Sequence, residues 1–499
     1  MTRKHNGRLL LVSLLLSFLF LGLCSKNSPL YPMNIWPDVN CFFTVGKSML
    51  HGMIPYRDLY EQKGPILYFI YALAAMISEN SFLGAYILDA LSFGLFLFFS
   101  GLCAKLYLGS SPAVYPIVAV LAAILSSVEA AAHGGSAEQM FLSLLMFSFW
   151  LINRSLCENR ILKLWEAFAI GICAGICLYV KFTFLGFFFG LALFVLVWYV
   201  LFEKQAKALP AVIGAFLGGI AAVSVPVFLY FLLNGAIGDF FTVYFYNNLF
   251  LYQKQEMSKL YFYLFYLYTS LRRNIEAGAF LVLGGVWMVL TLKKNYKLLT
   301  AFLLSELFLS VAVLAGGVFF IYYPMILMAP MVYGLIAAAQ LLGWIFRKIP
   351  ALASLNLKAR LAANLVLAAV LLGYSFVASS NTDFLGTEKE ELPQYRFAAQ
   401  MAQTESATLL NYGFLDGGFY FAADILPSTE FFCQLNIIME EMNLAQNRQV
   451  ENGMTDYVIT QNLKLEDCGL SACPYTLLDS APMELEGDTY TYYLYQRVN

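Results

Sequence analysis

Charged residues are scarce in this chain, and their scarcity excludes an ordinary soluble fold. Only 12% of the 499 residues are Asp, Glu, Lys or Arg, whereas 60% are hydrophobic. A soluble globular domain carries about 25% charged residues. Apolar runs near the roughly 20-residue length that spans a bilayer recur along the chain. This pattern is typical of a polytopic helical membrane protein.

Histidine is also scarce, because the whole chain holds only three. A histidine-based metal site is therefore not expected, and no cysteine spacing typical of a zinc site occurs. The glycine pattern of a dinucleotide-binding fold is absent as well. We predict no cofactor, with a divalent metal left open but without support, and we predict no nucleic-acid partner.

The hydrophobic pattern predicts about eleven transmembrane helices. Their approximate ranges are 9–24, 82–104, 112–128, 139–152, 164–180, 183–201, 209–233, 276–292, 298–317, 320–345 and 361–379. A further run at 65–78 is either a short span or a helix at the membrane interface. The first run lacks a small-residue cleavage site, so we expect a retained anchor rather than a cleaved signal peptide.

Basic residues set the expected orientation. A cytoplasmic N-terminus places 16 of the 25 Lys and Arg residues before residue 380 on the inner side. That bias follows the positive-inside rule. We therefore predict a multi-pass plasma (inner) membrane protein, and an odd number of spans puts the C-terminal segment outside the cell.

The C-terminal segment, residues 380–499, differs from the rest of the chain in charge. It holds 18 acidic and 5 basic residues, a formal charge of −13, whereas residues 1–379 carry +11. The stretch PQYRFAAQMAQ predicts a helix, and DYVIT and TYTYYLYQRV predict strands. We expect an all-α membrane domain over 1–379 and a small extracytoplasmic α/β domain over 380–499, packed over the membrane part.

The nine cysteines are scattered. Cys468 and Cys473 could close a small loop by a disulfide in an oxidising compartment, which would leave Cys433 without a partner. Six cysteines in or near the spans are expected to act as small apolar residues. They are Cys24, Cys41, Cys103, Cys157, Cys173 and Cys177.

The first outer loop, residues 25–80, carries more charge than a simple connection needs. Its central stretch is WPDVNCFFTVGKSMLHGMIPYRDLYEQKGPILYF. From Val39 onward the apolar residues share one helical face, which predicts an amphipathic helix on the membrane surface. Asp38 comes just before that helix, either as its N-cap or as a carboxylate available for chemistry. Lys63 comes where the chain returns to the membrane, where it either snorkels or contacts an anionic group.

This stretch resembles the first outer loop of the GT-C membrane glycosyltransferases, in the branch of the protein O-mannosyltransferases and the lipid A aminoarabinose transferases. Members of that branch have an acidic residue after the first span, here Asp38, and a turn like MLHGMIPY. Their K-P-P-L-x-Y motif is similar to the stretch from Lys63 to Tyr68, with Gly64 in place of the first proline.

Three later positions extend the resemblance over about the first 330 residues. The stretch GGSAEQMF places a second acid at Glu138, GICLYVKF places a lysine at Lys181, and FFIYYP places Tyr323 before a proline. The large outer loop at 234–275 departs from the family because it lacks histidine, which puts any histidine-dependent metal site in doubt.

The resemblance implies a GT-C-like fold and a reaction. A sugar would pass from a polyprenyl-phosphate donor to an unknown extracytoplasmic acceptor, with inversion at the anomeric carbon. Asp38 would be the general base, and Glu138 a second acid that orients the acceptor or supports Asp38. Lys63 and Lys181 would contact the phosphate as its negative charge develops.

Further substrate-binding candidates have less support. They are Tyr68, Tyr323, Arg272, Arg273 and His133. Most tyrosines of the loop at 234–275 fit an interfacial aromatic belt.

Structural alternatives remain for the main candidates. Glu138 could be a solvated loop acid, and Lys181 could pair with Glu138 instead of a phosphate, since a lysine at an outer span end needs a partner. For the whole protein, the alternative function is a transporter or flippase of lipid-linked saccharides or small molecules. Glu306 in LLSELFL is the main intramembrane charge on which transport would depend. A polymer-ligase relative is a third possibility.

Overall fold

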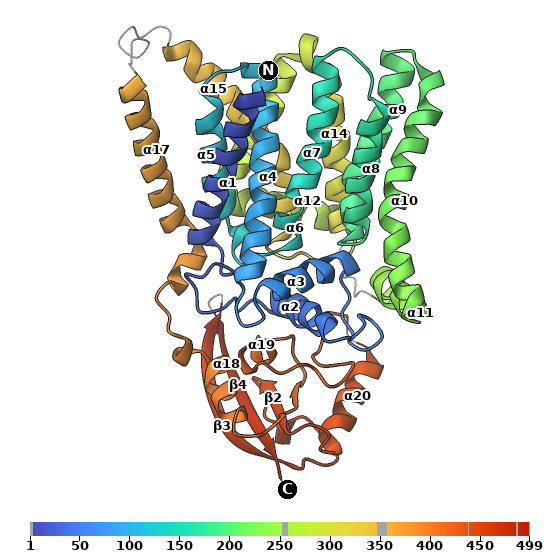
Figure 1. The fold of residues 1–499 in the computed structure, drawn as a ribbon, viewed down its shortest axis with the longest axis vertical. Coiled ribbons are helices and arrows are strands. Elements are labelled where there is room, and N and C mark those ends of the chain that lie inside the picture. The colour runs from blue at the N-terminus through green and yellow to red at the C-terminus, as the bar shows by residue number, and fades with distance from the viewer. Residues whose placement is uncertain (1–2, 252–257, 347–356, 438, 486–487, 499) are drawn as a thin grey trace. The chain divides into compact units, whose positions relative to one another are not determined.

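The computed structural model describes residues 3–251, 258–346, 357–437, 439–485 and 488–498 (Figure 1). The chain divides into two compact units, which are described separately below. The membrane unit comprises residues 1–28, 86–226 and 254–383. The mixed unit comprises residues 29–85, 227–253 and 384–499, so it joins the first outer loop to the C-terminal segment.

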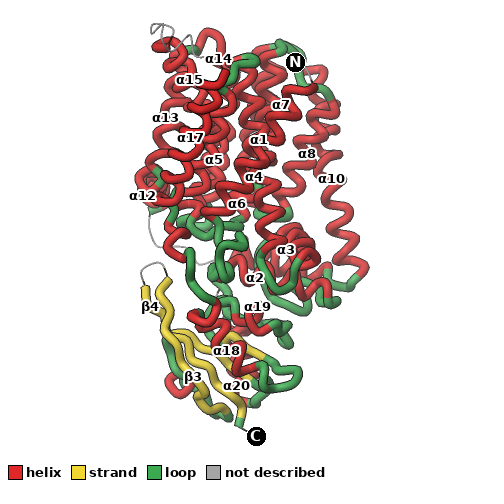
Figure 2. Tube along the Cα trace, turned by 60° about the vertical axis from the view of Figure 1, so that its left-hand side comes forward, coloured by secondary structure: helices red, strands yellow, loops and turns green. Residues whose placement is uncertain are grey.

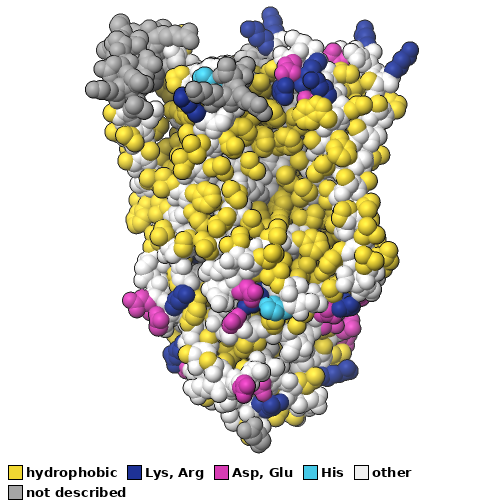
Figure 3. Space-filling view, viewed as in Figure 1, with side chains coloured by type: hydrophobic (Ala, Val, Ile, Leu, Met, Phe, Trp, Pro, Cys, Tyr) yellow, Lys and Arg dark blue, Asp and Glu magenta, His cyan; other side chains and the backbone are white. Residues whose placement is uncertain are grey.

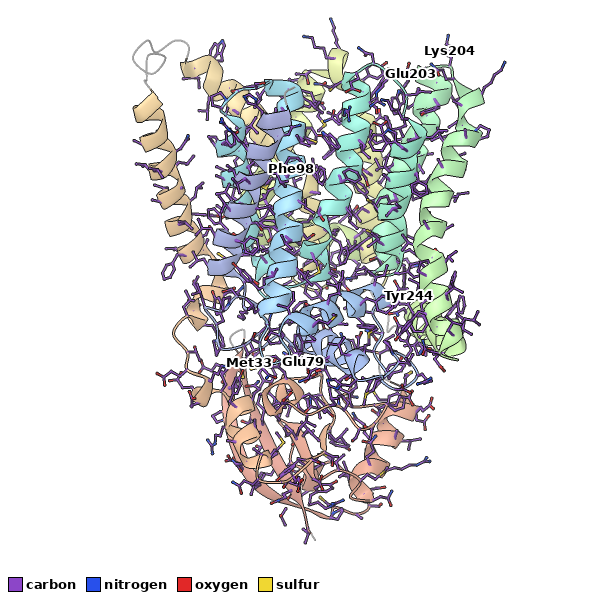
Figure 4. The ribbon with its side chains drawn as sticks, viewed as in Figure 1. Met33, Glu79, Phe98, Glu203, Lys204 and Tyr244 are labelled. Carbon is purple, nitrogen blue, oxygen red and sulfur yellow. The ribbon has the colours of Figure 1, made fainter. Side chains whose placement is uncertain are left out.

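Apolar helices, most of them long, build the membrane unit. They are α1 (Arg3–Cys24), α4 (Leu83–Leu108), α5 (Val114–Ser127), α6 (Ala137–Met140), α7 (Leu142–Cys157), α8 (Leu164–Leu178), α9 (Leu185–Val197), α10 (Leu209–Leu233), α12 (Lys259–Arg273), α13 (Ile275–Leu290), α14 (Leu292–Leu314), α15 (Val332–Phe346) and α17 (Leu357–Ala378). Hydrophobic side chains cover the visible face of these helices (Figure 3). Lys and Arg side chains gather at the end that carries Lys204 and the N-terminus (Figures 1 and 4).

The described residues contain seven helical segments that are long and apolar enough to cross a membrane. An eighth span results if α12 and α13, bent by 109° at their junction, count as one. The other three predicted spans also contain helices. Two of these are short, Val114–Ser127 and Leu164–Leu178, and the third is α17. A 15-residue helix is about 22 Å long, less than the roughly 30 Å of bilayer hydrocarbon. The prediction of a polytopic helical membrane protein is confirmed, and seven or eight spans satisfy the length criterion.

Helices α9 and α14 approach closely through two glycines four residues apart. A Cβ added at Gly186 would collide with the carbonyl oxygen of Phe308, and one at Gly190 with that of Leu304. Small residues at this spacing let helix backbones pack directly in a membrane.

Replacing Gly190 by Ala should therefore lower stability by about 1–3 kcal/mol, because the added methyl must push two backbones apart. Gly214 in α10 is the matched control, since a Cβ there meets nothing within 4 Å. Thermal unfolding in detergent should show a lower midpoint for Gly190→Ala only. Equal midpoints for both variants would contradict the close packing of α9 and α14.

The mixed unit combines short helices with a four-stranded sheet (Figure 2). Its helices are α2 (Pro37–Leu50), α3 (Pro65–Ile77), α11 (Ile237–Phe240), α18 (Pro393–Met401), α19 (Phe419–Ala423) and α20 (Glu440–Glu451), and a π-helix covers Phe241–Leu251. Its strands are β1 (Leu409–Asn411), β2 (Tyr457–Gln461), β3 (Tyr475–Leu485) and β4 (Asp488–Arg497). The order is β1-β2-β4-β3, with β1 parallel to β2 and the other pairs antiparallel. The predicted C-terminal α/β segment is thus confirmed.

Helix α2 differs from its prediction in two ways. It begins at Pro37, so Trp36 is the N-cap residue and Asp38 lies within the first turn; the N-cap assignment for Asp38 is wrong. Residues 38–48 are buried, so α2 does not present one apolar face to a membrane. Phe43 packs on Phe82 and on Phe421, with ring centroids 5.0 and 5.3 Å apart. A segment far along the chain therefore covers the apolar face of α2.

Candidate active site

One group of candidate site residues, here called the Asp38 cluster, consists of Asp38, Glu61, Lys63 and Tyr68 in the mixed unit. Asp38 is 7% exposed on the first turn of α2, where the helix dipole favours an acid. Lys63 Nζ lies 3.8 Å from Asp38 Oδ2. The structure thus brings together the carboxylate of Asp38 and the ammonium group of Lys63, which lie 25 positions apart in the sequence.

Local geometry fixes the position of Lys63. Tyr56 adopts a left-handed backbone conformation with φ of 71°, and its hydroxyl donates to the carbonyl oxygen of Lys63 at 2.5 Å. Immediately after Lys63, Gly64 is the N-cap of α3 and Pro65 takes the first helical position, which proline favours. Lys63 is therefore held between a buried turn and a helix start, and its side chain is only 16% exposed.

Glu61 is the member of the cluster that the sequence interpretation missed. Its side chain is buried, the Tyr68 hydroxyl donates to Glu61 Oε2, and the Lys63 backbone N–H donates to the same oxygen at 3.0 Å. Burial raises the pKa of Glu61 from 4.5 to about 7; nearby Lys63 opposes this shift and the charge of Asp38 adds to it. A carboxyl that titrates near neutral pH beside an ion pair is typical of functional sites.

The raised pKa of Glu61 makes stability depend on pH with a defined sign. Because its folded-state pKa exceeds its unfolded value, Glu61 stabilises the fold at low pH, and this stability is lost as pH rises through about 7. The loss should amount to about 3 kcal/mol. The midpoint of thermal unfolding should therefore fall more between pH 5 and pH 8 for the wild type than for Glu61→Gln. The control variant is Glu79→Gln, because Glu79 is a partly exposed acid that pairs with Lys47 and His51. Parallel pH profiles for the wild type and Glu61→Gln would contradict the raised pKa of Glu61.

A second group, here called the Glu138 cluster, consists of Glu138, Lys181 and Tyr323 in the membrane unit. Lys181 Nζ is 2.5 Å from Glu138 Oε1 and 3.7 Å from the centre of the Tyr323 ring. Glu138 is 1% exposed, which rules out a solvated loop acid. Lys181 therefore pairs with Glu138, as one of the alternatives in the sequence analysis predicted. Lys181 is held by an anion and by a cation–π contact at once.

The turn before α6 positions Glu138. Gly134 and Gly135 have φ of 74° and 76°, a backbone conformation that residues with a side chain rarely adopt. Ser136 then caps α6 by accepting a hydrogen bond from the Gln139 N–H at 3.1 Å. His133, before this turn, is 5% exposed, and its ring centre lies 6.2 Å from that of Tyr322.

A further acid that the sequence interpretation overlooked lies beside α6. Asp89 of α4 is fully buried, and its Oδ2 accepts a hydrogen bond from Gln139 Nε2 at 3.1 Å. The sequence did carry a signal for Asp89, because an acid inside an apolar membrane span is uncommon, but the interpretation considered only Glu306 on that ground.

The two arginines of the predicted site lie elsewhere in the membrane unit. Arg272 and Arg273 are exposed at the end of α12, and Arg273 Nη1 is 2.9 Å from Glu129 Oε1. No contact of either arginine with the Glu138 cluster is found in the described part of the chain. Within residues 3–251, 258–346, 357–437, 439–485 and 488–498, no three His, Cys, Asp or Glu side chains lie close enough to hold a metal ion.

Comparisons with known proteins show which solved structures share the fold of this chain. No protein-family model and no curated protein sequence matches the chain. Solved structures do match, and two of them are of ArnT from Cupriavidus metallidurans. The first is bound to undecaprenyl phosphate and has a TM-score of 0.60 at 14% identity, covering 99% of this chain and 98% of that one. The second, in the apo state, has the same TM-score and identity over 98% and 97%. The chain therefore has the fold of ArnT, a GT-C lipid A aminoarabinose transferase, as the resemblance predicted.

Proposed function

We propose that this protein is an inverting membrane glycosyltransferase that transfers a sugar from a polyprenyl phosphate to an extracytoplasmic acceptor. The observation that carries the proposal is the contact between Asp38 and Lys63 beside the buried Glu61, in a chain with the ArnT fold. A carboxylate and an ammonium held together supply the base and the cation that the reaction requires.

The Asp38 cluster performs the proton transfer in the proposed reaction. Asp38 accepts the proton of the acceptor hydroxyl or amine while that oxygen or nitrogen attacks the anomeric carbon. The bond from the anomeric carbon to the phosphate oxygen breaks, and the lipid phosphate leaves with the electron pair. Lys63 holds Asp38 in position before the reaction and turns to the phosphate as charge develops there. Tyr68 acts indirectly, since its hydroxyl bonds Glu61.

The Glu138 cluster supplies a second cation in the proposed reaction. Lys181 contacts the donor phosphate, and Glu138 with Tyr323 holds the ammonium of Lys181 in place. A cation fixed before the reaction stabilises the developing charge without reorganising in the transition state. Glu138 is therefore a positioning residue in this proposal, and His133 packs against Tyr322, the neighbour of Tyr323. Arg273 already pairs with Glu129, so Arg272 and Arg273 have the weakest claim to the donor.

The proposed orientation places the mixed unit outside the cell and the end with Lys204 in the cytoplasm. The collection of Lys and Arg at that end of the membrane unit supports this orientation. The partners of the reaction are then a polyprenyl-phosphate sugar, the lipid bilayer and an extracytoplasmic acceptor.

Transport is a second candidate function because Glu306 has a specific setting. It lies in α14 and lines a cavity of about 300 Å³, whose other polar lining residues are Ser270, Asn274 and Ser310. No hydrogen bond or ion pair links its carboxyl to any residue that the structure describes. Burying an acid inside a membrane span costs free energy, and such residues often mark a transport path.

Replacing Glu306 by Gln distinguishes the two functions. A transferase that uses the Asp38 and Glu138 clusters should keep its sugar-transfer rate in Glu306→Gln. Glu306 belongs to neither cluster, and no contact with the Glu138 cluster is found among the described residues of the membrane unit. The measurement is release of polyprenyl phosphate by purified protein in proteoliposomes. Uptake of labelled, intact donor by wild-type vesicles that is lost in Glu306→Gln would favour transport instead.

A further inference from the structure

Two cysteines that lie 392 positions apart in the sequence meet in the mixed unit. Cys41 is on α2, one helical turn after Asp38, and Cys433 is in the segment between α19 and α20. Their Sγ atoms are 3.9 Å apart, and each side chain is 1% exposed. Both are thiols in the structure. The sequence interpretation left Cys433 without a partner, and the structure supplies Cys41.

The backbone on the Cys433 side is fixed by hydrogen bonds. The Tyr60 N–H donates to the carbonyl oxygen of Glu430 at 2.9 Å, and the Gln434 N–H donates to that of Phe414 at 2.9 Å. On the other side, the Thr44 hydroxyl of α2 donates to Asp416 Oδ2 at 2.7 Å. These bonds hold the two cysteine-bearing segments against each other. The sulfurs must approach by about 2 Å to reach the length of a disulfide bond.

We propose that Cys41 and Cys433 form a disulfide bond in the mature protein. The inference rests on the proposed function in one respect, since it needs the mixed unit to fold in an oxidising compartment outside the cell. Each thiol gives up one proton and one electron as the sulfur–sulfur bond forms. The two electrons reduce the disulfide of a thiol–disulfide oxidoreductase to two thiols, which take up the two protons.

The bond forms during folding rather than afterwards. Thiol–disulfide exchange proceeds through a thiolate. Burial raises the pKa of Cys433, and for Cys41 the neighbouring thiol and burial raise it well above its usual value. The thiols in the finished fold are therefore both inaccessible and unreactive. The exchange must take place before α2 and the segment around Cys433 close over the sulfurs, and the completed bond is then protected from reductants.

The consequence is a covalent tie between the helix that carries Asp38 and the C-terminal part of the mixed unit. Loss of the tie should lower the midpoint of thermal unfolding by about 5 °C. Cys41→Ser, Cys433→Ser and the double variant should lose the same amount, because either single change removes the whole bond. Dithiothreitol during refolding should lower the midpoint of the wild type but not of the double variant.

Differential thiol labelling of the full-length protein tests the bond directly. Cells are lysed into denaturant with light N-ethylmaleimide, then the protein is reduced, labelled with deuterated N-ethylmaleimide, and its peptides are analysed by mass spectrometry. We expect Cys41 and Cys433 to carry only the deuterated label, and Cys103 and Cys173 only the light one. The unreduced digest should contain the Cys41 and Cys433 peptides joined, two hydrogens lighter than their sum.

Light label on both Cys41 and Cys433 would overturn the inference, as would a bond from Cys433 to Cys468 or Cys473. Labelling needs no activity, so this result does not depend on the proposed transfer reaction. Free thiols in an active transferase would overturn the disulfide alone. A disulfide in a protein without transferase activity would leave the bond established and overturn the proposed reaction.

Discussion

Replacing Asp38 by Asn should lower the rate of sugar transfer by about 100- to 10,000-fold, the usual contribution of a general base. Asn has the shape of Asp but cannot take the acceptor proton, and it cannot form the ion pair with Lys63 that Asp38 forms at 3.8 Å. The fold should survive, because the neutral amide fills the same space on the first turn of α2. The rate is measured as polyprenyl phosphate released per minute by purified protein.

The matched control for this variant is Asp58→Asn. Asp58 lies in the same loop and also pairs with a cation, Arg57, but it is 32% exposed and outside the Asp38 cluster. Its replacement should leave the rate near that of the wild type. If Asp38→Asn retains full activity in folded protein, or if Asp58→Asn loses as much, Asp38 is not the base.

Breaking the pair between Lys181 and Glu138 should lower both the stability of the protein and its rate of sugar transfer. Lys181→Met leaves Glu138 buried without its partner, which should cost about 3–5 kcal/mol of stability. The same change removes the second cation and should lower the transfer rate by about 100- to 1,000-fold, the effect of losing one preorganised group that stabilises charge. Thermal unfolding and the donor-release assay measure the two effects on the same samples.

The double variant Lys181→Met/Glu138→Gln decides what the pair does. Removing both charges should restore most of the unfolding midpoint, because no uncompensated charge remains buried. It should not restore the transfer rate, since no cation stands where the phosphate leaves. A double variant that regains both stability and activity would show that the pair only holds the fold together.

Hydropathy predicted where the helices lie but not how long each one is. The apolar run at 164–180 ends as a helix at Leu178, because the chain turns there to bring Lys181 toward Glu138. The sequence predicted that Lys181 has a partner, because a lysine at that end of a span requires an anion or an aromatic ring. The start of α2 was also predictable, since Pro37 favours the first helical position and leaves Asp38 in the first turn.

Tertiary contacts explain what sequence reasoning could not supply. Glu61 is two residues before Lys63, but only the fold shows that it is buried and bonded to Tyr68. The apolar face of α2 indicated a membrane surface, whereas Phe421 from the C-terminal segment contributes to covering it. The same long-range contacts place Cys433 beside Cys41. Pairings across almost 400 residues leave no periodic signal in one sequence.

The fate of a lipid-linked sugar tests the central claim most directly. Purified protein in proteoliposomes is incubated with a panel of polyprenyl-phosphate hexoses and pentoses. An envelope extract supplies the acceptor. Free polyprenyl phosphate and glycosylated product are then quantified by mass spectrometry. The account predicts equal amounts of both compounds for at least one donor and a product of inverted anomeric configuration. With Asp38→Asn it predicts that both compounds form about 100- to 10,000-fold more slowly. Donors that stay intact across the panel, or that only cross the bilayer, would contradict it.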